Sequence, residues 1–207
     1  MKTVRILFVI FVLATTALVK AQSTSPYLVA SNNSIETNTW QGLRFSYNSY
    51  TLDANDFDAV SAYEIGYIKS FLVSEKHPLF LEAGANVFYA TGDLLKGFSI
   101  DMYSLIIPLN IGYKVNLPNN LSFFPYFGLA LKGHLAGELG VDGLGDYDMF
   151  DNTDLGEKCN RFQVGWQIGA TLNIDKFNFG LSYGTDLIEL DDDVDTKTLK
   201  ISVGFNF

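Results

Sequence analysis

The strongest constraint on the fold is an alternation of apolar and polar residues with a period of two, because successive side chains of a β-strand point to opposite faces. The clearest case is the last segment, in which Leu199, Ile201 and Val203 alternate with Lys200 and Ser202. The same alternation recurs along the chain. It predicts eight β-strands, at residues 41–49, 61–73, 78–91, 104–115, 121–134, 160–174, 176–187 and 199–207.

The connections between these segments alternate in length. Short turns, with Pro and Asn in places that suit tight turns, occupy residues 74–78, 116–120 and 174–176. Long polar stretches occupy residues 50–60, 92–101, 135–159 and 187–196. An even number of strands with short turns at one end and long loops at the other describes an outer-membrane barrel. We therefore predict an all-β fold, an eight-stranded antiparallel up-and-down transmembrane β-barrel, with the short turns and both termini in the periplasm.

Side-chain volume predicts which face of each strand points outward. An eight-stranded barrel has an interior just wide enough to be filled by side chains, so the bulky set would overfill it. The alternate set is rich in glycine, at positions 66, 84, 112, 128, 165, 169, 180, 184 and 204. We therefore place the bulky side chains against lipid and the glycines in the lumen. A soluble barrel with the bulky set inside is the alternative.

The N-terminus has the features of a secretory signal peptide. Lys2 and Arg5 precede an apolar stretch at residues 6–19, and Ala21 is a small residue suited to cleavage before Gln22. The stretch is shorter than the roughly 20 residues that a membrane-spanning helix needs. We expect residues 1–21 to be the signal peptide, residues 22–40 an N-terminal periplasmic segment, and residues 41–207 the outer-membrane β-barrel domain.

The composition agrees with a membrane protein whose apolar residues are dispersed. Hydrophobic residues make up 48% of the chain and charged residues only 18%, below the roughly 25% usual in soluble proteins. The chain has one cysteine, Cys159, so it forms no internal disulfide. We interpret Cys159 as a loop residue and not as a nucleophile.

Both signs of charge occur on the face assigned to the lumen. The charged residues predicted to point inward are Arg44, Glu64, Glu82, Lys114, Lys132, Arg161, Asp186 and Lys200. Buried charges must be paired, so we predict a salt-bridged plug that closes the barrel. A proton or ion path is the alternative. Passage of large solutes is excluded, because aqueous channels belong to barrels of about 16 strands or more.

One lysine does not fit the assignment of faces. Lys69 is in phase with Tyr67 and Phe71 on the lipid face, where a charge near the bilayer midplane would cost about 2–4 kcal/mol. Either a β-bulge turns it inward or its long side chain reaches the interface. The lumen is not purely polar either, because Phe80, Phe88, Phe124 and Tyr126 fall on that side.

Acidic residues are concentrated in the long connections. Loss of Lys2, Arg5 and Lys20 with the signal peptide takes the net charge from −9 to −12. Such a surface repels nucleic acid and favours cations or basic partners; a solvated, antiadhesive surface is the simpler interpretation. Four residues have the spacing of an EF-hand-type calcium loop, although Phe150 stands where an oxygen ligand belongs: Asp146, Asp148, Asp154 and Glu157.

The spacing of the residues gives little support for a catalytic site. The chain has two histidines. His77 lies in a turn with no evident serine partner, and His134 is predicted to point into the lumen beside an acidic loop. No His-Ser-Asp arrangement can be assembled from the spacing. We therefore predict no catalytic, cofactor-binding or metal residues, no cofactor, and a protein that is not an enzyme.

The strand sequences resemble the outer-membrane β-barrel domain family common in the Bacteroidota, which includes PorT-like proteins and small OmpX-like barrels. The resemblance covers about residues 40–207, and a terminal aromatic such as Phe207 is similar to the signal for barrel assembly. The stretches that carry it are 80–86, 107–114, 125–129, 161–169 and 203–207. It implies the fold and the cell outer membrane, and it assigns no activity.

The leading functional hypothesis is a small non-enzymatic barrel whose acidic extracellular loops have a surface-interaction or envelope-structural role. The alternatives are an accessory component of a protein-secretion or envelope-assembly complex, and a lipid-modifying outer-membrane enzyme. The expected partners are outer-membrane lipid, the barrel-assembly machinery during insertion and an envelope protein. Nucleic acid is not expected as a partner.

Overall fold

The computed structural model describes residues 39–53, 58–74, 76–150, 159–188 and 195–207. The predicted signal peptide and the predicted periplasmic segment up to residue 38 lie outside these ranges, as do Asp154 and Glu157 of the calcium hypothesis. The described residues contain no helix long and apolar enough to cross a membrane.

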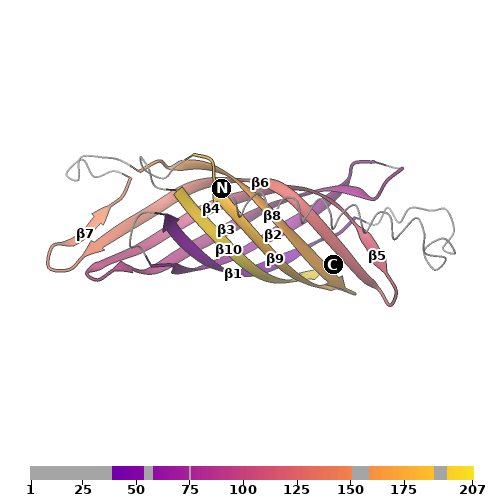
Figure 1. The fold of residues 1–207 in the computed structure, drawn as a ribbon, viewed down its shortest axis with the longest axis horizontal. Coiled ribbons are helices and arrows are strands. Elements are labelled where there is room, and N and C mark those ends of the chain that lie inside the picture. Colours follow the sequence, from indigo (N-terminus) through magenta and orange to yellow (C-terminus); the bar gives the residue numbers. More distant parts are fainter. Residues whose placement is uncertain (1–38, 54–57, 75, 151–158, 189–194) are drawn as a thin grey trace.

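The described residues form ten antiparallel β-strands, and eight of them close into a barrel (Figure 1). The eight barrel strands are β1 (Gln41–Asp53), β2 (Val60–Leu72), β3 (Leu79–Leu95), β4 (Phe98–Tyr113), β6 (Leu121–Val141), β8 (Phe162–Ile174), β9 (Phe177–Asp186) and β10 (Asp195–Asn206). Closure comes from the β1–β10 pairing and from the β4–β6 pairing. The predicted eight-stranded antiparallel barrel is confirmed.

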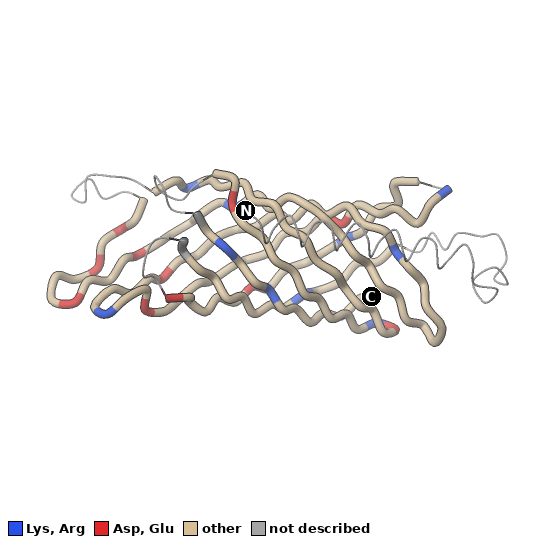
Figure 2. Tube along the Cα trace, in the orientation of Figure 1, with Lys and Arg blue, Asp and Glu red and all other residues tan. Residues whose placement is uncertain are grey.

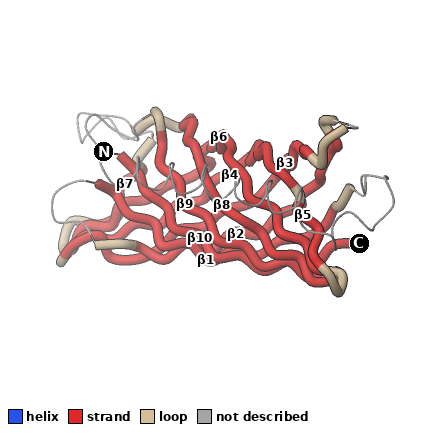
Figure 3. The backbone as a smooth tube through the Cα atoms, turned by 45° about the vertical axis from the view of Figure 1, so that its right-hand side comes forward, coloured by secondary structure: helices blue, strands red, loops and turns tan. Residues whose placement is uncertain are grey.

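The two remaining strands are short and lie at opposite ends of the barrel. β5 (Val115–Leu117) pairs with β6 in the turn after β4, and β7 (Gly145–Asp148) pairs with the far end of β6. We call the end with β5 the turn end and the end with β7 the loop end. Figure 3 shows the strands running obliquely and continuously between these two ends.

The prediction of long polar loops at residues 92–101 and 135–159 is wrong for much of their length. β3 and β4 stay paired as far as Leu95 and Phe98, and β6 and β7 form a further hairpin. Gly97 and Gly143, with φ of 88° and 81°, make the tight turns possible. The outer face of these hairpins is polar, which gives the sequence the composition of a loop.

The assignment of faces is confirmed. Leu43, Ile65 and Leu181 are each more than half exposed on the outside, whereas Phe80 and Phe124 are fully buried inside. Glycine is needed where strands crowd the lumen. A Cβ atom on Gly112 would clash with the Pro125 carbonyl oxygen and would lie 2.7 Å from the Phe124 ring.

Two apolar clusters fill the ends of the lumen. The turn-end cluster consists of Phe80, Phe124 and Tyr126, with Trp40 and Leu72 packed against it. The loop-end cluster is larger and consists of Tyr50, Val60, Ala62, Phe88, Ala90, Leu94, Ile100, Met102, Ile106, Ala130 and Phe150. Polar side chains fill the rest of the lumen, and some of them, Ser122, Asn173, Asn178 and Asn206, lie at the turn end itself.

Trp40, the residue before β1, packs into the turn end of the lumen. Its ring lies 5.0 Å from those of Phe80 and Phe124, measured between centroids. Its main chain pairs with Ser70 in β2, whose amide donates to the Trp40 carbonyl. Residue 40 is therefore part of the barrel interior, and it covers the turn-end cluster.

Candidate functional site

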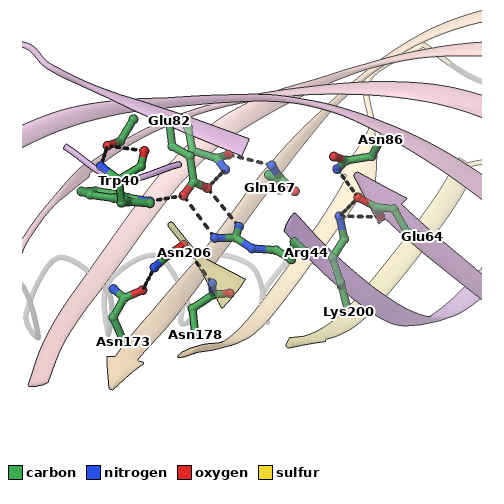
Figure 4. A network of polar contacts seen from close by, with 12 residues as sticks. Trp40, Arg44, Glu64, Glu82, Asn86, Gln167, Asn173, Asn178, Lys200 and Asn206 are labelled. Atoms are coloured by element: carbon green, nitrogen blue, oxygen red, sulfur yellow. Dashed lines mark hydrogen bonds and ion pairs between the residues drawn. The ribbon is translucent and has the colours of Figure 1, made fainter. Parts of the chain in front are cut away.

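A buried guanidinium–carboxylate pair occupies the lumen above the turn-end cluster (Figure 4). Arg44 of β1 approaches Glu82 of β3 with both terminal nitrogens, at 3.1 and 3.2 Å. Glu82 also accepts hydrogen bonds from Trp40 Nε1 at 3.0 Å and from Asn110 Nδ2 at 3.3 Å. The carboxylate thus has four donors, as a buried charge requires.

Two further ion pairs continue the polar network toward the loop end. Lys200 Nζ lies 2.9 Å from Glu64, which also accepts a hydrogen bond from Asn86. Lys132 Nζ lies 2.8 Å from Asp186. Six of the eight charged residues predicted to line the lumen therefore form the predicted salt-bridged plug.

The other two charged residues differ from the prediction. Arg161 is exposed at the loop end, where its guanidinium lies 5.0 Å from the centroid of the Phe150 ring. Lys114 lies between β4 and β5 at the turn end, with Nζ 5.4 Å from the centroid of the Trp40 ring. Each lies just beyond a barrel strand. Arg161 has left the inward face predicted by alternation, whereas Lys114 still reaches the ring of Trp40 in the barrel interior.

A small cavity separates the Glu64–Lys200 pair from the Lys132–Asp186 pair. Its volume is about 30 Å³, and Asn48, Phe88 and Gln167 contribute to its wall. A cavity needs roughly 10–15 Å³ for a water molecule, so this one has room for about two. Apolar clusters lie beyond the network at both ends, which supports a plug and weighs against an ion path.

A serine–histidine pair lies under the loop-end cluster, and the sequence did not predict it. Ser104 Oγ lies 2.7 Å from His134 Nδ1, and His134 Nε2 lies 2.7 Å from Gln163 Oε1. The amide oxygen of Gln163 can only accept, so Nε2 carries the proton and Ser104 donates to Nδ1. Phe150 stacks on the imidazole at 5.5 Å, and all three polar side chains are buried.

This pair was missed because its members come from different strands with an irregular register. β4 and β6 lose one step of pairing between Tyr103 and Ser104, which leaves Leu135 without a partner in the ladder. Such a bulge reverses the inward and outward positions beyond it. Strict alternation from the inward His134 would place position 138 on the inner face, but the extra residue at the bulge makes Glu138 point outward.

At the loop end, the wall of the barrel continues as a four-stranded sheet. This loop-end sheet consists of the ends of β3, β4 and β6 together with β7 (Figure 1). Its inner face contributes Leu94, Ile100 and Met102 to the loop-end cluster. The packed inner face holds the sheet against the barrel.

The outer face of the loop-end sheet carries five carboxylates, which we call the carboxylate face. Asp101, Glu138 and Asp148 are directly opposed on β4, β6 and β7. Asp93 and Asp146 lie one row further out. Figure 2 shows acidic residues gathered at this end. Like charges directly opposite each other destabilise a sheet, so the arrangement is costly for the fold alone.

The calcium hypothesis receives no support from the described residues. Asp146 and Asp148 lie on β7, and no group of three or more metal-ligating side chains occurs in the part of the chain that the structure describes.

The comparison with protein families decides the membership of this chain. The model of the outer membrane protein beta-barrel domain family matches residues 7–207. The chain belongs to this family. The predicted resemblance to outer-membrane barrels is therefore confirmed at the level of the family, and the protein is placed in the cell outer membrane.

Solved structures agree with this outer membrane β-barrel fold, although no curated protein matches the chain. Ail, the attachment invasion locus protein of Yersinia pestis, is 11% identical over 82% of this chain and 99% of its own, with a TM-score of 0.51. Neisserial surface protein A is 12% identical over 82% and 97%, with a TM-score of 0.46. The outer membrane enzyme PagL is 14% identical over 77% and 97%, with a TM-score of 0.48. At such identities the likeness concerns the fold alone.

Membership of the family makes the outward apolar face the surface in contact with lipid. In outer-membrane barrels the short turns face the periplasm and the longer connections face outside. The turn end is thus periplasmic and the loop end extracellular. Lys69 keeps its outward position without a bulge, three residues before the periplasmic end of β2. Of the two explanations for Lys69, the structure supports the side chain that reaches the interface.

Because the outward face contacts lipid, a charged residue placed on it should destabilise the barrel by an amount that depends on its depth in the membrane. Ile65 lies in the middle of the outward face of β2, and Val73 lies just past the strand end. Ile65→Arg is expected to lower the free energy of unfolding by about 2–4 kcal/mol and Val73→Arg by about 0–1 kcal/mol. Denaturant titration in lipid vesicles measures both. Equal costs would contradict the membrane position of β2.

Proposed function

We propose that this barrel is not an enzyme and has a surface-interaction or envelope-structural role that it performs through the loop-end sheet. The observation that carries the proposal is the pairing of β3, β4, β6 and β7 at the loop end, with apolar side chains inside and carboxylates outside. A packed sheet presents its side chains in a fixed arrangement, as an interaction surface requires.

The filled lumen supports the same proposal. In the described part of the chain, three ion pairs and two apolar clusters occupy the interior, with a cavity of about 30 Å³ between two of the pairs. A barrel filled in this way acts through the surfaces it presents. The carboxylate face presents five acidic side chains, and it fits a partner with basic groups.

The test neutralises the carboxylate face without changing its shape. The triple variant Asp101→Asn, Glu138→Gln and Asp148→Asn is expected to fold at least as stably as the wild type, because it removes like-charge pairs. Cross-linking on intact cells, followed by purification of the barrel, measures its envelope partners. The triple variant is expected to lose partners that the matched control Asp142→Asn retains. An unchanged set of partners in the triple variant would refute the proposal.

A lipid-modifying enzyme is the second candidate, and the Ser104–His134 pair favours it. Hydrogen bonding to an imidazole is how serine nucleophiles are activated. The pair lies beneath Phe150, however, and its side chains do not line the cavity. We expect purified protein to leave labelled lipid A and labelled phospholipid unchanged. Turnover that disappears in Ser104→Ala and His134→Ala would establish the enzyme instead.

A role beside a secretion apparatus is the third candidate, and the resemblance of the strand sequences to PorT-like proteins of the Bacteroidota motivates it. The stretches 107–114 and 161–169 belong mostly to the barrel wall, in β4 and β8. A chain that serves secretion should lose secreted proteins from the medium when its gene is deleted. Under our proposal, secretion persists in both the deletion and the triple variant.

A further inference from the structure

A band of aromatic side chains with two lysines surrounds part of the periplasmic end on the outer surface. The aromatic members are Tyr67 and Phe71 of β2, Phe177 of β9, and Phe205 and Phe207 at the end of β10. The two lysines are Lys69 of β2 and Lys176 of the turn between β8 and β9. Both are exposed. We call these seven residues the periplasmic band.

Contacts between neighbours make the periplasmic band continuous across β2, β1, β10 and β9. Lys69 Nζ lies 5.7 Å from the centroid of the Phe71 ring. Tyr67 donates a hydrogen bond to Gln41 Oε1 at 2.9 Å, and its ring lies 6.5 Å from that of Phe207.

The same surface continues to the second lysine. Lys176 Nζ lies 5.9 Å from the centroid of the Phe205 ring, which itself lies 5.6 Å from the ring of Phe177. The Asn206 amide donates to the Lys176 carbonyl, which joins the turn to β10. Both lysines therefore lie at the edges of one aromatic surface.

Among the described residues, neither Lys69 nor Lys176 forms an ion pair. The neighbouring Asp175 carboxylate accepts a hydrogen bond from Asn120 at 2.9 Å. A lysine on a lipid-facing wall places its charge at the headgroups, where its aliphatic chain can remain in contact with apolar groups.

We propose that the periplasmic band binds an anionic phospholipid of the inner leaflet. Lipid phosphate groups pair with Lys69 at one edge of the band and with Lys176 at the other, and the acyl chains lie on the aromatic rings of Tyr67, Phe205 and Phe207 between them. Charge complementarity supports this occupant, because the acidic residues gather at the opposite end of the barrel (Figure 2). This lipid site is separate from the interaction role proposed for the loop-end sheet, because it lies at the periplasmic end of the barrel.

The test compares lipid retention by the folded full chain. Purified protein is incubated with mixed micelles of phosphatidylglycerol or phosphatidylcholine, and native mass spectrometry counts the lipids that remain bound. The wild type is expected to retain phosphatidylglycerol preferentially. Each lysine near an anionic surface contributes about a fivefold preference for the anionic lipid. The double variant Lys69→Met with Lys176→Met should therefore reduce the preference for phosphatidylglycerol over phosphatidylcholine about thirtyfold. Lys96→Met, at the extracellular hairpin tip, is the matched control and should change nothing.

Two further measurements separate binding from folding. A salt titration of the wild type should reduce the preference, because salt screens exposed charges. Lys69→Arg with Lys176→Arg should retain it, because the charge remains. Equal retention of the two lipids by the wild type, or an undiminished preference in the double Met variant, would overturn the proposal. Neither result bears on the carboxylate face.

Discussion

Arg44→Met is expected to lower the free energy of unfolding by about 3–5 kcal/mol, because it leaves the Glu82 carboxylate buried without its cation. Both side chains lie in the lumen, and Glu82 is almost completely buried. The remaining donors to Glu82 are the neutral groups of Trp40 and Asn110. Denaturant titration of the protein folded in lipid vesicles, followed by the heat-dependent shift on a denaturing gel, measures the loss.

The control for this prediction removes the negative charge as well. Glu82→Gln keeps an oxygen that can accept from Trp40 and Asn110, so Arg44→Met with Glu82→Gln should recover most of the loss and come within about 1–2 kcal/mol of the wild type. Equal losses in the single and the double variant would show that packing, and not the buried charge, determines the stability of this layer.

Trp40→Ala is expected to cost about 3–5 kcal/mol of the free energy of unfolding, because it removes a large ring from the turn-end cluster. The ring contacts Phe80 and Phe124, and its Nε1 donates to Glu82. Trp40→Phe keeps most of the packing and loses only the hydrogen bond, so a cost of about 1–3 kcal/mol is expected. The same titration in lipid vesicles measures both variants.

Fluorescence provides an independent measurement of the position of Trp40. The chain has two tryptophans, and Trp166 lies on the outer wall beside Phe127 and Tyr183. In a Trp166→Phe background, the emission of Trp40 should resist a soluble quencher in the folded barrel and become accessible on unfolding. A Trp40 that is quenched freely in the folded protein would mean that residue 40 belongs to the periplasmic segment, as the sequence suggested.

Much of the barrel could be predicted because alternation is a local property. The residues that show it, such as Leu199, Ile201 and Val203, identify both the strand and its outward face. The same pattern failed at residues 92–101 and 135–141, where small and polar residues on the outer face hid paired strands. It also failed for Arg161, which lies just outside β8.

The candidate sites were less predictable than the fold because they join distant positions. Ser104 and His134 meet only after the bulge in the β4–β6 pairing sets their register. The opposition of Asp101, Glu138 and Asp148 likewise needs the register of three strands. The sequence showed an excess of acidic residues in these segments, but not that they share one face.

The sequence by itself determined the period of the strands, the side of each strand that meets lipid and the presence of both signs of charge in the lumen. Only the tertiary structure decided that Arg44 pairs with Glu82, that Lys200 pairs with Glu64, and that Trp40 enters the barrel. The physical reason is that alternation depends on neighbours along the chain. The choice of partners depends on the tilt and stagger by which the barrel closes.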